Sequence, residues 1–214
     1  MVEIKVKAFL FDMDGVVTDT EPQYDALWES MQKEYRPEIP DLHRKVKGTT
    51  LPDIIQRYFS DFTEERKAEL VGKIMDFEMN QMVYKEVAGA TSFIKSLKDN
   101  GIKAALVTSS YNEKVDIALK SLGLDDAFDV LVTSDDVRRG KPDPQCYLKA
   151  AEKLKLNPLE CIVFEDSLAG LKAGRAARMR VVGLSTTLPY STVRELTRDV
   201  LPNFEGVSVE SIIG

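Results

Sequence analysis

Five short apolar runs alternate with stretches of helical periodicity along most of this chain. The runs span residues 8–11, 104–107, 130–132, 162–164 and 181–184. Short runs rich in Val, Ile and Phe that alternate with helices are typical of a parallel sheet with helices on both faces. The pattern therefore predicts an α/β fold, in which a doubly wound, mainly parallel sheet forms a Rossmann-like core.

Helices are predicted between these strands. They span residues 91–100, 113–122, 144–156 and 167–177. Gly101 and Gly123 follow the first two helices, at the position where a helix end favours a residue in the left-handed conformation.

Residues 21–85 interrupt this alternation. The segments EPQYDALWESMQKEY, LPDIIQRYF and EERKAELVGKIMDFEMNQMVY have helical spacing and no strand signal. They are too long for one crossover connection, so they predict a small helical domain inserted after the first strand. We expect a core domain made of residues 1–20 and 86–214, with residues 21–85 as the insert. The hinges should lie near residues 15–21 and 84–90.

Composition and charge exclude several classes of protein. The 214 residues are 43% hydrophobic and carry a net charge of −6, which fits a globular protein and argues against nucleic acid as a partner. No apolar run nears the ~20 residues of a membrane span, and the first residues do not resemble a signal peptide. The two cysteines, Cys146 and Cys161, are expected to be buried and reduced. We expect a cytoplasmic monomer without a membrane partner.

Polar side chains follow each of the first four predicted strands. Because the carboxyl ends of parallel strands meet at one edge of the sheet, these groups are expected to converge. They are Asp12, Asp14, Thr108, Ser109, Ser110, Lys141, Glu165 and Asp166. Each group alone has an ordinary structural explanation, as a turn, a helix N-cap or a loop lysine before a proline. Their joint position favours a site of chemistry.

The spacing of Asp12 and Asp14 places two carboxylates on one face of the chain. At ~4 Å and an effective dielectric of ~20 they would repel by ~4 kcal/mol, which a cation or a shared proton relieves. This arrangement suits phosphoryl transfer, because an ionised carboxylate can attack phosphorus directly. A divalent cation held by Asp12, Asp166 and a backbone carbonyl would offset the charge of the phosphate. Lys141 and the Thr108 hydroxyl would bind phosphate oxygens, and the second aspartate would transfer protons.

Four motifs occur in the order FDMDGVVTDTEP, LVTSS, GKPDP and VFEDSLAGLKAG. They resemble the four motifs of the haloacid dehalogenase superfamily of phosphotransferases, and the insert resembles the cap domain of the subgroup that includes beta-phosphoglucomutase. The resemblance implies an aspartyl-phosphate mechanism, with Asp12 as nucleophile and Asp14 as general acid and base. It also implies further roles: Thr108 and Lys141 at the phosphate, Mg²⁺ on Asp12, the Asp14 carbonyl and Asp166, and Glu165 as a supporting carboxylate near the metal.

One turn of the insert is a candidate for substrate recognition. In caps that this insert resembles, the equivalent turn contributes to specificity, so Lys47, Gly48 and Thr49 are expected to face the substrate. The residues alone are equally compatible with an ordinary loop and N-cap. On the core side, Ser109 and Asn112 are the expected substrate contacts.

The leading interpretation is a Mg²⁺-dependent phosphatase that acts on a small phosphorylated metabolite, such as a sugar or polyol phosphate. A phosphomutase like beta-phosphoglucomutase is the alternative. The mutases carry a histidine, an arginine and a lysine where this sequence has Tyr24, Leu51 and Tyr111. These departures remove groups that would position the sugar and the phosphate that is not transferred, and they disfavour mutase activity.

Other functions fit less well. A dehalogenase would not need both Asp14 and the Glu165-Asp166 pair, and a receiver-like signalling domain lacks a large helical insert. His43 is the only histidine, so a Ser-His-Asp or Cys-His hydrolase would have to use it. It has no matching nucleophile motif, and we expect it on the surface or packed within the insert.

Overall fold

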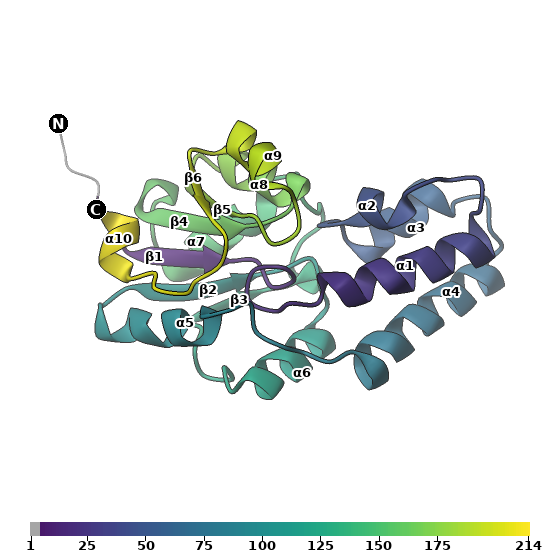
Figure 1. Cartoon of the computed structure of the whole chain (residues 1–214), viewed down its shortest axis with the longest axis horizontal. Coiled ribbons are helices and arrows are strands. Elements are labelled where there is room, and N and C mark those ends of the chain that lie inside the picture. The colour runs from purple at the N-terminus through teal and green to yellow at the C-terminus, as the bar shows by residue number, and fades with distance from the viewer. Residues whose placement is uncertain (1–4) are drawn as a thin grey trace.

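The computed structural model describes residues 5–214 and contains a six-stranded sheet in which all neighbouring strands are parallel (Figure 1). The strand order is β3-β2-β1-β4-β5-β6, which is the order of a doubly wound α/β sheet. The strands are Ala8–Phe11 (β1), Lys103–Val107 (β2), Val130–Val132 (β3), Cys161–Glu165 (β4), Arg180–Leu184 (β5) and Asp199–Leu201 (β6). The predicted fold class is confirmed.

The central strand β1 is apolar because both of its faces are covered. All four of its residues are fully buried. Phe9 and Phe11 pack in one hydrophobic layer, whereas Ala8 and Leu10 pack in the other, as alternating side chains of a strand must. β1 pairs with β2 on one side and with β4 on the other, so the residues that follow these three strands emerge side by side.

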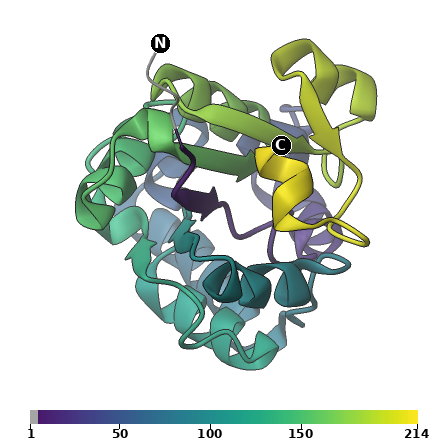
Figure 2. The same ribbon diagram turned by 90° about the vertical axis from the view of Figure 1, so that its left-hand side faces the viewer.

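Helices cover both faces of the sheet (Figure 2). The layer of Phe9 and Phe11 is completed by α5 (Ala90–Asp99), α6 (Asn112–Leu122) and α10 (Val209–Ile213). The opposite layer is completed by α7 (Gln145–Leu154), α8 (Leu168–Ala176) and α9 (Tyr190–Leu196). Short 3₁₀ turns occur at Ser134–Asp136 and Pro158–Glu160.

The predicted elements of the core are present, and their ends differ from the expected ones by at most two residues. Gly101 and Gly123 adopt the expected left-handed conformation, with φ of +65° and +62°. Three C-terminal elements were not predicted: α9, β6 and α10. The edge strand β6 has only three residues, all partly exposed, and therefore lacks the apolar run that identifies a buried strand.

The segment after β1 is helical, as expected. It contains α1 (Glu21–Tyr35), α2 (Leu42–Val46), α3 (Leu51–Tyr58), α4 (Glu64–Asp76) and a π-helical turn at Phe77–Gln81. Thr50 and Thr63 cap α3 and α4 with their side chains. These helices share a hydrophobic core of their own, built around side chains such as Trp28, Phe59 and Leu70. They lie beyond the carboxyl ends of the strands (Figure 1), and we call them the cap.

Two adjacent segments connect the cap to the sheet. The backbone N–H of Asp19 donates to the carbonyl of Lys85 (2.8 Å), and the N–H of Val87 donates to the carbonyl of Val17 (3.0 Å). The connections are thus tied to each other where the chain leaves and re-enters the core. No helix within residues 5–214 is long and apolar enough to cross a membrane.

Candidate active site

The carboxyl ends of β1, β2 and β4 meet beneath the cap, and a cavity lies between them. The core contributes Asp12, Asp14, Thr108, Ser109 and Asp166 to its wall. The structure therefore brings together the polar groups that follow successive strands. Glu165 and Lys141 are buried next to this wall, at 0% and 3% exposure.

Lys141 connects two of the acids. Its Nζ atom lies 2.9 Å from Asp12 Oδ1 and 2.6 Å from Glu165 Oε1, and it donates to the carbonyl of Val107 (3.1 Å). Burial by itself would lower the pKa of Lys141, but the charges of Asp12 and Glu165 outweigh burial and raise it. The lysine is therefore held as a cation beside the Asp12 carboxylate.

Glu165 fixes this lysine in place. Its Oε1 atom accepts from Lys141 and from the Tyr147 hydroxyl (2.6 Å). The Oε2 atom accepts from the Ser167 hydroxyl (3.1 Å) and from the backbone N–H groups of Asp166 and Ser167. Gly170 of α8 lies so close that a Cβ atom there would be 1.7 Å from Oε1. Both oxygens of Glu165 are thus engaged by protein donors. Its role at the site is to position Lys141.

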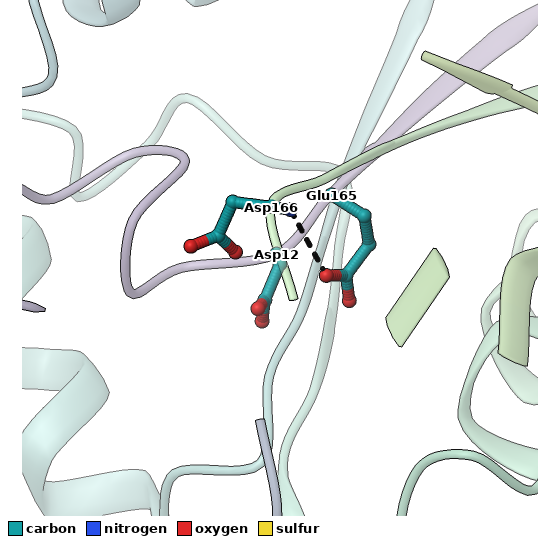
Figure 3. A group of neighbouring side chains, drawn as sticks. All are labelled: Asp12, Glu165 and Asp166. Carbon is teal, nitrogen blue, oxygen red and sulfur yellow. Dashed lines mark hydrogen bonds between the residues drawn. The ribbon is translucent and has the colours of Figure 1, made fainter. Parts of the chain in front are cut away.

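Asp12, Glu165 and Asp166 each place a carboxylate oxygen within 4.8 Å of the others. Figure 3 shows these three side chains next to one another. Burial, followed by the charge of Glu165, raises the pKa of Asp12 to about 7 and that of Asp166 well above its usual range. Within residues 5–214, Asp166 has no lysine or arginine partner and accepts a hydrogen bond only from the Thr187 hydroxyl. A cation would relieve this repulsion.

The donor set fits a hard divalent cation. Asp12 and Asp166 supply carboxylate oxygens, which Mg²⁺ prefers. No donor in residues 5–214 is bonded to the backbone carbonyl of Asp14, so this oxygen is also free. Gly15 follows with φ of +78°, and a Cβ atom there would lie 1.9 Å from Asp166 Oδ2. The glycine thus allows the chain to turn against the acid cluster.

Asp14 lies in a separate network from Asp12. Its Oδ1 atom accepts from the Thr20 hydroxyl (2.5 Å), while Oδ2 accepts from Lys114 Nζ (2.6 Å) and from the Ser110 hydroxyl (3.1 Å). Burial by itself would raise the pKa of Asp14, but the Lys114 ammonium and these donors together lower it. The pKa values of these two neighbouring acids are therefore shifted in opposite directions, upward for Asp12 and downward for Asp14.

Of the three core residues expected to contact phosphate or substrate, Thr108 and Ser109 line the cavity and Asn112 does not. Thr108 is buried at the end of β2, and its Oγ1 accepts from the N–H of Ser110 (3.0 Å). The Ser109 hydroxyl donates to the carbonyl of Gly48 in the cap (3.3 Å), so it joins the two parts of the molecule. Asn112 is not among the residues that line the cavity; its Oδ1 accepts from the Thr133 hydroxyl (3.0 Å).

The expected recognition turn of the cap does line the cavity. Lys47, Gly48 and Thr49 all contribute to its wall. The Nζ atom of Lys47 lies 2.6 Å from Glu21 and 2.8 Å from Asp25 of α1, and these acids, opposing the effect of burial, raise its pKa. The Thr49 hydroxyl donates to the carbonyl of Val46.

The remaining wall of the cavity is aromatic and acidic. Glu78, in the π-helical turn of the cap, accepts from the hydroxyls of Tyr24 and Tyr111. Trp28 packs in the cap core and also lines the cavity. His43 lines the cavity too, and its Nδ1 atom is buried without a hydrogen-bond partner.

A family model for haloacid dehalogenase-like hydrolases matches residues 6–178, which is most of the chain and includes the polar groups that follow β1 to β4. The chain belongs to this family. The resemblance inferred from the four motifs is confirmed.

Several relatives of the chain are named as phosphatases. The chain is 32% identical over 197 residues to the phosphorylated carbohydrates phosphatase of Thermotoga maritima, covering 86% of the chain and 87% of the relative. It is 30% identical over 214 residues to hexitol phosphatase A of Escherichia coli, covering 96% and 95%. Beta-phosphoglucomutase of Clostridium difficile is a structural neighbour, with a TM-score of 0.76 at 27% identity and coverage of 97% and 95%. The prediction of a phosphatase of this family is confirmed.

Two residues of this hydrolase's site were not found from the sequence: Lys114 and Glu78. Lys114 lies one turn after Ser110 on α6, and the only available signal was that a lysine at this spacing shares a face with the hydroxyl. Glu78 lies at the end of a long segment with helical spacing, where an acidic residue is expected to be solvent-exposed. Its contacts are made with Tyr24 and Tyr111, which are distant along the chain, so no local sequence pattern could predict them.

Proposed function

We propose that this protein is a Mg²⁺-dependent phosphohydrolase that cleaves a small phosphorylated metabolite, a sugar or polyol phosphate, through an aspartyl-phosphate on Asp12. The single observation that carries the proposal is the position of Asp12. It follows the central strand, lies 2.9 Å from the buried Lys141 cation and belongs to the cluster with Asp166. A carboxylate in this setting is available for attack on phosphorus and is surrounded by groups that bind oxygen anions.

The first half-reaction forms the phosphoenzyme. A carboxylate oxygen of Asp12 bonds to phosphorus as the bond to the leaving-group oxygen breaks. Mg²⁺ on Asp12, Asp166 and the Asp14 carbonyl would supply positive charge that offsets the repulsion between carboxylate and phosphate. Lys141 and the hydroxyl of Thr108 would bind the phosphate oxygens.

Asp14 would manage the protons in both half-reactions. It donates a proton to the leaving oxygen and later accepts one from the water that attacks the aspartyl-phosphate. That water releases inorganic phosphate and restores the Asp12 carboxylate. Thr20, Ser110 and Lys114 fix the Asp14 side chain from three directions, so the same group can serve both steps.

The cap would select the leaving group. We assign residues 21–85 to the cap domain and residues 1–20 and 86–214 to the core domain, and we expect closure of the cap to exclude bulk water. The names of the Thermotoga and Escherichia relatives favour a carbohydrate or hexitol phosphate as substrate. Lys47, Gly48 and Thr49, with Ser109 opposite, are the expected contacts at the junction.

A beta-phosphoglucomutase activity is the second candidate, because a named mutase shares the fold at 27% identity. The cavity argues for hydrolysis instead. Tyr24 and Tyr111 replace polar groups of the mutases, and both hydroxyls are engaged with Glu78. Without cap groups that capture a second phosphate, water is expected to reach the phosphoenzyme first.

Phosphate release from a panel of sugar and polyol phosphates, with and without Mg²⁺, tests this function. Activity should disappear on chelation, and Asp12→Asn should lower turnover by more than ~10²–10⁴, the range for loss of acid–base assistance alone. An acid quench should trap a hydroxylamine-sensitive phosphoenzyme in the native protein only. Full activity of Asp12→Asn would refute the mechanism.

The mutase alternative is decided on beta-glucose 1-phosphate in the presence of a bisphosphate activator. Free phosphate should exceed glucose 6-phosphate among the products. The opposite ratio would make the protein a mutase.

A further inference from the structure

Glu78 is unusual among the buried acids of residues 5–214. Asp12 and Glu165 both contact Lys141, and Asp166 belongs to the candidate metal cluster. Glu78 is buried to a similar degree, at 7% exposure, but no lysine or arginine in these residues lies within 4 Å of its carboxylate. A buried carboxylate without a cation is costly, and such groups concentrate at functional sites.

Two tyrosines hold this carboxylate in the wall of the cavity. Oε1 accepts from the Tyr24 hydroxyl of α1, and Oε2 accepts from the Tyr111 hydroxyl of the core (2.9 Å). No other donor in the described residues reaches either oxygen. Because each carboxylate oxygen accepts two hydrogen bonds, each retains one unused lone pair. The tyrosines therefore orient Glu78 but leave it able to accept from a ligand.

A second polar atom on the cap side also lacks a partner. His43 lines the same cavity, and its Nδ1 atom is buried with no hydrogen bond in residues 5–214. Buried polar atoms are nearly always paired, so an unpaired one in a cavity wall indicates that a ligand or water completes it. An imidazole nitrogen can pair with a hydroxyl whether it carries the proton or not.

The cations of the cavity are already engaged. Lys47 contacts Glu21 and Asp25, and Lys114 contacts Asp14. Beyond the phosphate-binding end, the described residues of the wall thus offer no free lysine, and Glu78 is a carboxylate that no lysine contacts. A second phosphate or a carboxylate on the substrate would meet Glu78 without a free cation to balance it.

We infer that Glu78 determines specificity: it accepts hydrogen bonds from hydroxyls of a neutral, polyhydroxylated leaving group and excludes substrates that carry a second anionic group. The inference rests on the proposed phosphatase function and narrows its substrate class. A neutral ligand is favoured over a cationic one because Lys114 Nζ already lies 4.7 Å from the centre of the Tyr24 ring, whose hydroxyl binds Glu78.

Glu78→Gln tests the inference, since it keeps the shape and removes the charge. The probes are sorbitol 6-phosphate, which is neutral beyond its phosphate, and fructose 1,6-bisphosphate. Rates are divided by the acetyl phosphate rate of the same variant, because acetyl phosphate has no hydroxyls to contact Glu78. The native protein should prefer the hexitol phosphate, and Glu78→Gln should reduce this preference by about tenfold or more, mainly through KM.

Two further variants separate charge from structure. Glu69→Gln is the matched control, because Glu69 also lies on the cap and accepts from a tyrosine hydroxyl, Tyr35 (2.9 Å), but does not line the cavity. It should leave the preference unchanged. Tyr111→Phe breaks the bond between cap and core but retains the carboxylate, so discrimination against the bisphosphate should persist. If Glu78→Gln and Tyr111→Phe reduced the preference for sorbitol 6-phosphate equally, Glu78 would serve only to link cap and core, and the inference would be overturned.

Binding measurements keep this test independent of turnover. In the Asp12→Asn background with Mg²⁺, calorimetry should show tighter binding of sorbitol 6-phosphate than of fructose 1,6-bisphosphate, and adding Glu78→Gln should narrow that difference by about tenfold. An unchanged preference would overturn the role of Glu78 even if the protein is an active phosphatase. Tighter binding of glucosamine 6-phosphate than of glucose 6-phosphate, lost in Glu78→Gln, would show a cationic ligand and refute the neutral class. If the native protein hydrolysed none of these substrates, the proposed phosphatase function would be refuted, whereas the binding preference would still test the role of Glu78.

Discussion

At the scale of single residues, the two aspartates of the first motif have different partners. Asp12 shares Lys141 with Glu165, whereas Asp14 has Lys114 to itself. Lys114 is 1% exposed, and its Nζ atom contacts the Asp14 carboxylate and donates to the Ser110 hydroxyl at 2.9 Å. Removing one member of such a buried pair leaves the other charge uncompensated.

Lys114→Met should therefore destabilise the fold by about 2–3 kcal/mol, somewhat less than for a fully buried pair because the Asp14 side chain is 18% exposed. In an Asp14→Asn background the same substitution should cost clearly less, because no unpaired carboxylate remains. Urea unfolding of the four proteins of this cycle measures the coupling. Lys120→Met, at an exposed position of the same helix, should change stability by at most about 0.5 kcal/mol. Additive effects of the two substitutions would contradict the pair.

A site residue could be predicted from the sequence when it lies at the end of a predicted strand. Asp12, Thr108 and Glu165 come directly after apolar runs, and strand ends converge in a parallel sheet. Lys114 and Glu78 carry no such mark, because helices direct them into the cavity from a distance. Their contacts depend on how the cap packs over the core, which periodicity does not specify.

At the scale of elements, the turn between α2 and α3 forms a close contact between cap and core. Gly48 has φ of +71°, and a Cβ atom there would lie 2.5 Å from Ser167 Oγ. Its carbonyl also accepts from the Ser109 hydroxyl. The absence of a side chain at Gly48 is thus what allows the cap to approach the N-terminus of α8.

Gly48→Ala should hinder this approach and lower kcat/KM for the preferred sugar phosphate by about tenfold or more, since small misplacements of a closing element strongly affect catalysis. Gly101→Ala is the matched control, because Gly101 has a similar φ of +65° but no atom within 4 Å of the added Cβ. Both substitutions introduce left-handed strain of about 1–2 kcal/mol. If both variants retain equal activity, the contact does not limit closure.

The core strands and the helical insert could be predicted because each has a clear period and a continuous apolar face. The C-terminal α9, β6 and α10 could not, because they are short and partly exposed. Val182 pairs with Asp199, so β6 adds to the sheet through main-chain bonds at its edge. Such pairing leaves little hydrophobic pattern in the sequence.

At the scale of the whole molecule, the carboxyl edge of the sheet concentrates negative charge in a chain whose net charge is already −6. Asp12, Glu165 and Asp166 are all buried there, and Lys141 is in contact with only the first two. The metal-free protein therefore holds one buried acid, Asp166, that no lysine or arginine in residues 5–214 contacts. Function and stability make opposite demands at this position.

Asp166→Asn should separate these demands. In the absence of metal the variant should be more stable than the native protein by about 1 kcal/mol, or about 2–4 °C in Tm, because it removes a buried like charge and its amide oxygen can still accept from Thr187. Mg²⁺ should stabilise the native protein by about 2.7 kcal/mol at a concentration of 100 times its Kd, and stabilise the variant far less. Thermal unfolding with EDTA and across a Mg²⁺ series measures both effects. Asp116→Asn, at an exposed position of α6, should reproduce the native Mg²⁺ response. A metal-free Asp166→Asn protein that is less stable than the native one, or that responds equally to Mg²⁺, would show that Asp166 serves packing and not a cation.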